Sequence, residues 1–135
     1  LLRQRSRPYL FSNAVPPLIC AATIEVIKML SQTTELRDKL EENTKYFRGE
    51  LGKVGLKVLE GTHPITPIMF GDAKLAADVA LDMLTEGVYV KGFSFPVVPK
   101  GAARIRCQVS AVHTKAELDH TVQSFAKVCK KHGII

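Results

Sequence analysis

The sequence predicts an α+β domain, in which a mostly antiparallel sheet has helices packed on one of its faces. Residues 104–111 alternate between apolar and polar side chains, which is typical of a half-buried strand. Four other segments repeat apolar residues at the spacing of a helix. Along the chain, two helices come first, and a pair of short extended segments follows on each side of the third helix. This grouping favours a single sheet with helices on one side.

The first two helices are expected before residue 55. Pro16 and Pro17 stand where the first helix begins, and a proline in a first helical turn loses no hydrogen bond. Apolar residues then recur at positions 18, 22, 26 and 30. The second helix is expected over residues 34–54, with Gly55 ending it. Its apolar stripe consists of Leu36, Leu40, Phe47, Leu51 and Val54.

Extended segments are expected at residues 56–59, 67–70 and 88–90. Asp72 is suited to cap the third helix, which Gly87 ends. Thr114 and Glu117 form a capping-box pattern at the start of the last helix, which Gly133 closes. The inward residues expected on these two helices are Leu75, Ala76, Val79, Ala80, Met83 and Leu84, and Leu118, Val122, Phe125 and Cys129.

The alternating strand places Arg104 and Arg106 on the face opposite Ile105 and Cys107. Arginine stays charged, and its planar fork matches a carboxylate or a phosphate. Residues 92–101, with two prolines and two phenylalanines, are expected to form a stiff apolar loop beside this strand. The strand and the loop could therefore anchor a small anion. The alternative, which is common for such a pattern, is a solvent-exposed sheet face with two surface arginines.

Composition excludes several classes of function. The 135 residues suit one hydrophobic core, and no apolar run approaches a membrane span, so no membrane partner is expected. The net charge of +6 is spread along the chain, so no nucleic-acid partner is expected. The three cysteines have no metal-ligand spacing, and we expect free thiols, no disulfide framework and no metal.

Four segments, at residues 3–13, 64–72, 92–101 and 103–113, resemble the C-terminal part of the glycine C-acetyltransferases, a branch of the α-oxoamine synthase family. The stretch Phe-Pro-Val-Val-Pro-Lys-Gly at residues 95–101 is the most specific, and Arg-Ile-Arg at 104–106 is shared more widely. The resemblance spans essentially the whole chain. It implies the small C-terminal domain of a fold type I pyridoxal-phosphate enzyme, with residues 18–135 in that domain and residues 1–17 from the interdomain or cofactor-domain region.

The resemblance also implies an activity. Enzymes of this branch are homodimers that use pyridoxal 5'-phosphate to condense glycine with acetyl-CoA into 2-amino-3-ketobutyrate and CoA, a step of threonine breakdown. Their cofactor-bonding lysine stands in a Gly-Lys motif that lies before the matching region, and the resemblance gives no counterpart of it in this chain. We therefore expect a fragment that holds no catalytic residue and is inactive alone. The full enzyme would be cytoplasmic in a bacterium and in the mitochondrial matrix in a eukaryote.

Three residues are assigned by the resemblance. Arg106 matches the arginine that binds the substrate carboxylate, and Ser12 and Asn13 match the pair that reaches the cofactor phosphate of the neighbouring subunit. Arg104 is expected to be a structural ion-pair partner, and His113 to have a local structural role. His120 and His132, on the last helix, are expected to be solvated.

Two alternatives remain open. One is another α-oxoamine synthase, of the type that makes 8-amino-7-oxononanoate or 5-aminolevulinate, and the loop at residues 95–101 separates these types. The other is a stand-alone module that binds a small anion without a cofactor. A module would need a self-sufficient start, and the incomplete pattern of residues 1–13 argues against it.

Overall fold

A computed structural model describes residues 1–10 and 14–135 of the chain, with the backbone alone at residue 10. The described residues form two compact units, Leu1–Thr34 and Glu35–Ile135. The proposed cofactor-binding residues Ser12 and Asn13 lie outside the described residues.

The described residues of the first unit form three helices, α1 (Leu2–Arg5), α2 (Arg7–Leu10) and α3 (Pro17–Gln32). Pro17 occupies the first turn of α3, as the sequence predicts. No residue of α3 is buried. Its exposed apolar side chains include Leu18, Ile19, Ile24, Val26, Ile27, Met29 and Leu30.

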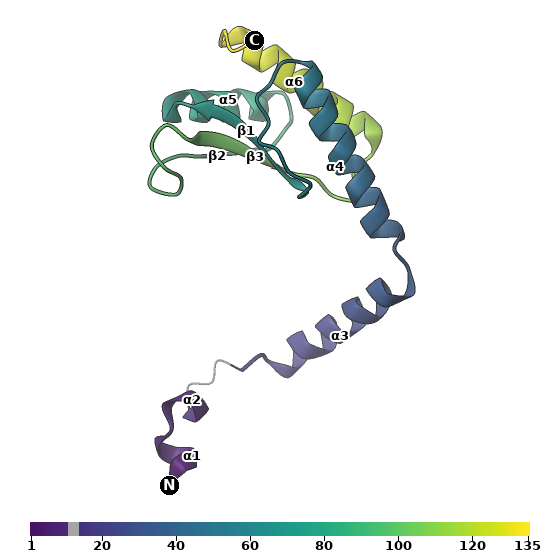
Figure 1. Ribbon diagram of the computed structural model, residues 1–135, viewed down its shortest axis with the longest axis vertical. Helices are drawn as coiled ribbons and strands as arrows, with labels where there is room; N and C mark the ends of the chain where they lie inside the picture. The colour runs from purple at the N-terminus through teal and green to yellow at the C-terminus, as the bar shows by residue number, and fades with distance from the viewer. Residues whose placement is uncertain (11–13) are drawn as a thin grey trace. The chain divides into compact units, whose positions relative to one another are not determined.

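The second unit is a three-stranded antiparallel sheet with helices on one face, which confirms the α+β class (Figure 1). Its elements are α4 (Glu35–Lys53), β1 (Ile65–Gly71), α5 (Ala73–Thr85), β2 (Lys91–Phe93), β3 (Ala103–Gln108) and α6 (Lys115–Lys131). The strand order is β1-β3-β2, so the arginine strand β3 is central. Helix α5 contacts all three strands and α6, and α6 also contacts α4.

The alternation of β3 decides which face is covered. Ala103, Ile105 and Cys107 are buried, and they share their face with Thr66 and Ile68 of β1. The helices complete this core with Phe47, Leu51, Val79, Met83, Leu118, Val122, Phe125 and Cys129. Burial of this apolar face against three helices fixes the register of β3, because a slip of one residue would turn Arg106 into the core.

The helix ends follow the predicted capping chemistry. The Asp72 carboxylate accepts a hydrogen bond of 2.7 Å from the backbone N–H of Leu75 at the start of α5. Thr114 and Glu117 form both hydrogen bonds of a capping box at the start of α6. Gly87, with φ of 80°, follows the end of α5 in the left-handed region that favours glycine.

The position predicted for the edge strand from the sequence is wrong. Residues 88–90 are outside the ladder, and β2 instead contains Gly92 and Phe93, which were expected in the proline loop. A Cβ at residue 92 would lie 3.2 Å from the carbonyl oxygen of Ala76, so glycine allows β2 to approach α5 closely. Pro96 comes three residues after the end of β2 and does not interrupt the ladder.

Two residues expected to face inward do not. Leu84 of α5 is 54% exposed and Leu36 of α4 is 55% exposed. Both lie near an end of their helix, where the apolar stripe runs past the elements that the helix packs against.

Candidate carboxylate-binding site

Arg106 lies on the uncovered face of the sheet, near the middle of the central strand. In the antiparallel register it is opposite Pro67 of β1 on one side and Lys91 of β2 on the other. Residues directly opposite each other in an antiparallel sheet point to the same face. Arg106 is exposed, so its charged group is presented to solvent from a strand that is hydrogen-bonded on both sides.

The Arg106 guanidinium is held over an aromatic ring. Its central carbon lies 4.4 Å from the centre of the Phe93 ring. Such a contact attracts the cation to the ring face and limits the rotamers that the long side chain samples. The N–H groups at the edge of the guanidinium remain available for a planar acceptor. This arrangement suits bidentate binding of a carboxylate.

A groove of about 860 Å³ borders Arg106. Its basic lining residues are Lys91, Arg106, His113 and His120, and its acidic lining residue is Glu117. The Glu117 carboxylate is occupied by the capping box, where it accepts from the N–H of Thr114 at 2.7 Å and from its hydroxyl at 2.9 Å. These bonds, the backbone one first, lower the pKa of Glu117. The groove therefore favours an anion at the Arg106 end.

His113 holds the turn that follows β3. Its Nδ1 accepts a hydrogen bond of 3.2 Å from the backbone N–H of Ser110. Asn43 of α4 donates to the carbonyl oxygens of Ser110, at 3.0 Å, and His113, at 2.9 Å. In the neutral ring this leaves the proton on Nε2. These bonds match the local structural role expected for His113.

Arg104 has a different role from the one expected. Its Nε donates to the carbonyl oxygen of Ala102 at 3.2 Å, and within residues 14–135 no acidic side chain pairs with it. The expected ion pair is therefore absent there, because the face that β3 shares with its neighbours offers Arg104 a backbone acceptor and no carboxylate.

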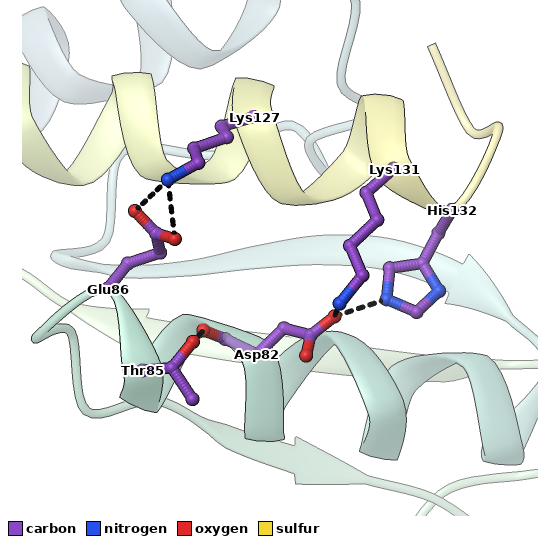
Figure 2. A network of polar contacts seen from close by, with 6 residues as sticks. All are labelled: Asp82, Thr85, Glu86, Lys127, Lys131 and His132. Atoms are coloured by element: carbon purple, nitrogen blue, oxygen red, sulfur yellow. Dashed lines mark hydrogen bonds and ion pairs between the residues drawn. The ribbon is translucent and has the colours of Figure 1, made fainter.

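His132 is not solvated as expected, because it joins a network between α5 and α6 (Figure 2). The Asp82 carboxylate contacts Lys131 Nζ at 2.9 Å and His132 Nε2 at 2.7 Å. Lys127 pairs with Glu86 at 2.8 Å, and the nearby His120 Nε2 lies 3.1 Å from the carbonyl oxygen of Glu86. The sequence indicated only that cations lie near the end of the last helix. It did not indicate these contacts, because the partners are 34 to 50 residues apart along the chain.

Five lysines, at positions 28, 39, 53, 74 and 91, lie in surroundings that do not suit a covalently bound cofactor. Lys28, Lys53 and Lys74 are exposed on helices and pair with Glu25, Glu50 and Asp78, respectively. The hydrogen bond that Lys74 donates to Asp78 is the main cause that raises the pKa of Lys74, whereas a nucleophilic lysine needs a lowered pKa. Lys39 and Lys91 are exposed as well. None of these five lysines has the buried environment of a cofactor-bonding residue.

The described part of the chain contains no group of three or more His, Cys, Asp or Glu side chains able to hold a metal ion. Among the same residues, no helix combines the length and apolar character needed to cross a membrane.

A family model for class I and II aminotransferases matches residues 1–125, and the chain belongs to this family. It is 47% identical over 134 residues, 99% of the chain, to the 2-amino-3-ketobutyrate coenzyme A ligase of Escherichia coli K12, covering 34% of that protein. It is 44% identical over its whole length to the mitochondrial enzyme of the same name from Mus musculus, covering 32% of it.

Other similar proteins carry the names of different enzymes. An 8-amino-7-oxononanoate synthase from Thermosipho melanesiensis is 43% identical over 99% of the chain and 34% of that protein. Among solved structures, a serine palmitoyltransferase variant from S. paucimobilis with bound PLP matches with a TM-score of 0.86 and 29% identity, over 98% of this chain and 34% of that one. These matches confirm the resemblance seen in the sequence. The chain spans about a third of the length of the relatives it matches.

Proposed function

We propose that the chain is the C-terminal part of a pyridoxal-phosphate-dependent acyltransferase that condenses glycine with acetyl-CoA into 2-amino-3-ketobutyrate and CoA. The observation that supports this proposal most is the position of the Arg106 guanidinium, which projects from the central strand and is held over the Phe93 ring. The identity of 47% to a 2-amino-3-ketobutyrate coenzyme A ligase favours this reaction among those of the family.

In this proposal Arg106 binds the glycine carboxylate through two parallel N–H···O bonds. Two contact points stop the carboxylate from rotating, so the substrate Cα–H bond keeps one direction. The central strand and Phe93 hold the guanidinium in place before the substrate arrives, so less side-chain freedom is lost on binding. Arg106 thus orients the substrate and moves no proton.

Pyridoxal phosphate, when bound, supplies the electron sink that stabilises a carbanion at the substrate Cα. Ser12 and Asn13 are proposed to donate hydrogen bonds to its phosphate from the neighbouring subunit of a homodimer. A hydroxyl and an amide suit that task, because both are neutral donors. The five lysines described above are exposed, and the chain spans about a third of the length of its relatives. Both observations support the proposal that the cofactor-bonding lysine lies in the part of the enzyme that this chain does not span.

The setting of the enzyme follows from the same proposal. It would act in threonine breakdown, in the cytoplasm of a bacterium or in the mitochondrial matrix of a eukaryote, as the bacterial and mitochondrial relatives suggest. Within it, residues 18–135 would belong to the small C-terminal domain and residues 1–17 to the interdomain or cofactor-domain region.

The test is release of free CoA by the full-length protein, loaded with pyridoxal phosphate and given glycine and acetyl-CoA. We expect glycine-dependent release, with a higher kcat/KM for acetyl-CoA than for longer or carboxylated acyl-CoA esters. A preference for a long or carboxylated ester would instead favour a synthase of the 8-amino-7-oxononanoate or 5-aminolevulinate type, to which the relative from Thermosipho melanesiensis points.

The role of Ser12 and Asn13 is tested by mixing two inactive full-length variants. One lacks the cofactor-bonding lysine and the other has Ser12→Ala and Asn13→Ala. If these residues serve the partner's site, mixed dimers regain part of the activity, because each contains one intact site. Mixed dimers that form and stay inactive would contradict this role.

A further inference from the structure

We propose that Lys91 is a second cation for the substrate carboxylate, acting beside Arg106. This inference rests on the proposed function and names a further binding residue for it. Lys91 opens β2 and is directly opposite Arg106 in the register. Both side chains are exposed, and both line the groove of about 860 Å³.

The pairing brings the two charges within reach of one anion. Opposite residues of an antiparallel pair have Cα atoms about 4.5–5.5 Å apart and project side by side. A lysine has a flexible four-carbon stem and a compact charge, whereas the Arg106 guanidinium is held over Phe93. The ammonium of Lys91 can therefore move to a carboxylate that the Arg106 fork already holds.

The charge on this face is unbalanced, which is the second observation behind the proposal. The register places eight side chains together on the uncovered face: Ile65, Pro67, Met69, Lys91, Phe93, Arg104, Arg106 and Gln108. Three of them are cations and none is an acid. Among residues 14–135, no acidic side chain pairs with Lys91 or Arg106.

Like charges placed directly opposite each other destabilise a sheet. Lys91 and Arg106 form such a pair, and an anion bound between them would add two attractions that offset their repulsion. A lysine at this position therefore costs stability in the empty site and adds affinity in the filled one. Arg106 supplies the geometry of binding, and Lys91 supplies charge.

This division of roles predicts a specific kinetic pattern in the full-length enzyme. Lys91→Gln should raise the KM for glycine about two- to five-fold at low ionic strength, the range of an exposed charge pair, with kcat and the KM for acetyl-CoA retained. Added salt should shrink the difference, because exposed charges are screened. Lys91→Arg should restore the wild-type KM. The matched control is Lys130→Gln, which removes an exposed charge from α6, on the covered side of the sheet.

A binding measurement separates this inference from the proposed function. The 135-residue chain is titrated with potassium acetate, against potassium chloride at equal ionic strength, and backbone amide NMR shifts are followed. We expect saturable shifts at Lys91, Gly92 and Arg106 that Lys91→Gln weakens and Lys130→Gln leaves unchanged. If the full-length protein shows no glycine-dependent activity but this pattern holds, the carboxylate site stands and the proposed reaction fails.

Three results would overturn the role of Lys91. One is an acetate titration that Lys91→Gln does not alter. Another is a glycine KM equal to that of the Lys130→Gln control. The third is a change confined to the KM for acetyl-CoA, which would show that Lys91 faces the CoA ester and not the amino acid.

Discussion

Arg106 of the central strand and Phe93 of the edge strand form a cation–ring contact, with 4.4 Å between the guanidinium carbon and the ring centre. Phe93 is opposite Arg104 in the register, so the Arg106 side chain reaches diagonally across the ladder to contact it. The two residues are on the same face of the sheet. The short strand β2 therefore does more than pair with β3, because its Phe93 ring holds the charged group of Arg106 on the central strand.

Phe93→Leu in the full-length enzyme should raise the KM for glycine about two- to five-fold, because a cation–ring contact at an exposed site contributes roughly 0.5–1 kcal/mol. Phe93→Tyr keeps the ring face and should retain the wild-type KM. Steady-state kinetics with varied glycine at saturating acetyl-CoA measures both. An equal loss in the leucine and tyrosine variants would mean that the ring fills space and does not hold Arg106.

The capping box of α6 gives a prediction about stability. Thr114→Ala removes the hydroxyl that accepts from the N–H of Glu117 and should lower the free energy of unfolding by about 0.5–2 kcal/mol. Thr114→Ser keeps that acceptor and serves as the control. Urea denaturation of the 135-residue chain, followed by circular dichroism, measures the change. An alanine variant as stable as the serine variant would argue against the cap.

The link between α5 and α6 makes a prediction about pH. Hydrogen bonds from Lys131 first, and then from His132, lower the pKa of Asp82 in the folded chain from its ordinary value of 3.8. The ionised carboxylate therefore stabilises the fold above pH 3.8, and this stabilisation is lost as the pH falls through the lower pKa of the folded state. Asp82→Asn should reduce the urea midpoint at pH 7, and the gap to wild type should close in acid.

The control for this measurement is Asp78→Asn, which breaks an exposed pair within α5 alone, between Asp78 and Lys74. It should change the urea midpoint less than Asp82→Asn does, because it does not join two helices. A gap between wild type and Asp82→Asn that stays constant from pH 7 down to strong acid would contradict the role given to the Asp82 carboxylate.

The cysteines should differ in reactivity. Burial raises the pKa of Cys107 to about 12 and that of Cys129 to about 11, whereas Cys20 is exposed on α3. Because the thiolate is the reactive form, iodoacetamide at pH 8 should label Cys20 and leave the other two unmodified. Peptide mass spectrometry of the native chain measures this, and labelling in urea should reach all three. Rapid native labelling of Cys107 would contradict its place in the core.

The elements that could be predicted from the sequence are those determined by residues close together in the chain. Asp72 and Thr114 mark helix starts through their own side chains, and the alternation around Ile105 and Arg106 assigns the two faces of β3 directly. The core positions Phe125 and Cys129 were found in the same way, from helical spacing along α6. Each of these features depends on residues that are close together in the chain.

Features that depend on distant residues were missed. The start of β2 depends on the approach of Gly92 to the carbonyl of Ala76, which no pattern in the sequence states. The Asp82–His132 contact joins residues fifty positions apart, and the pairing of Lys91 with Arg106 depends on strand register. The Arg106 assignment itself came from a resemblance to known enzymes, because an exposed arginine on a strand is ordinary by itself.

The most direct test of the account is the kinetics of Arg106→Lys in the full-length enzyme. Lysine keeps the charge but loses the fork, so the carboxylate is held at one point and can rotate. Loss of a charge-assisted hydrogen bond costs about 1.5–3 kcal/mol, so kcat/KM for glycine should fall roughly 10- to 150-fold while the KM for acetyl-CoA stays near wild type. Unchanged kcat and KM for glycine in this variant would contradict Arg106 as the residue that binds the substrate carboxylate.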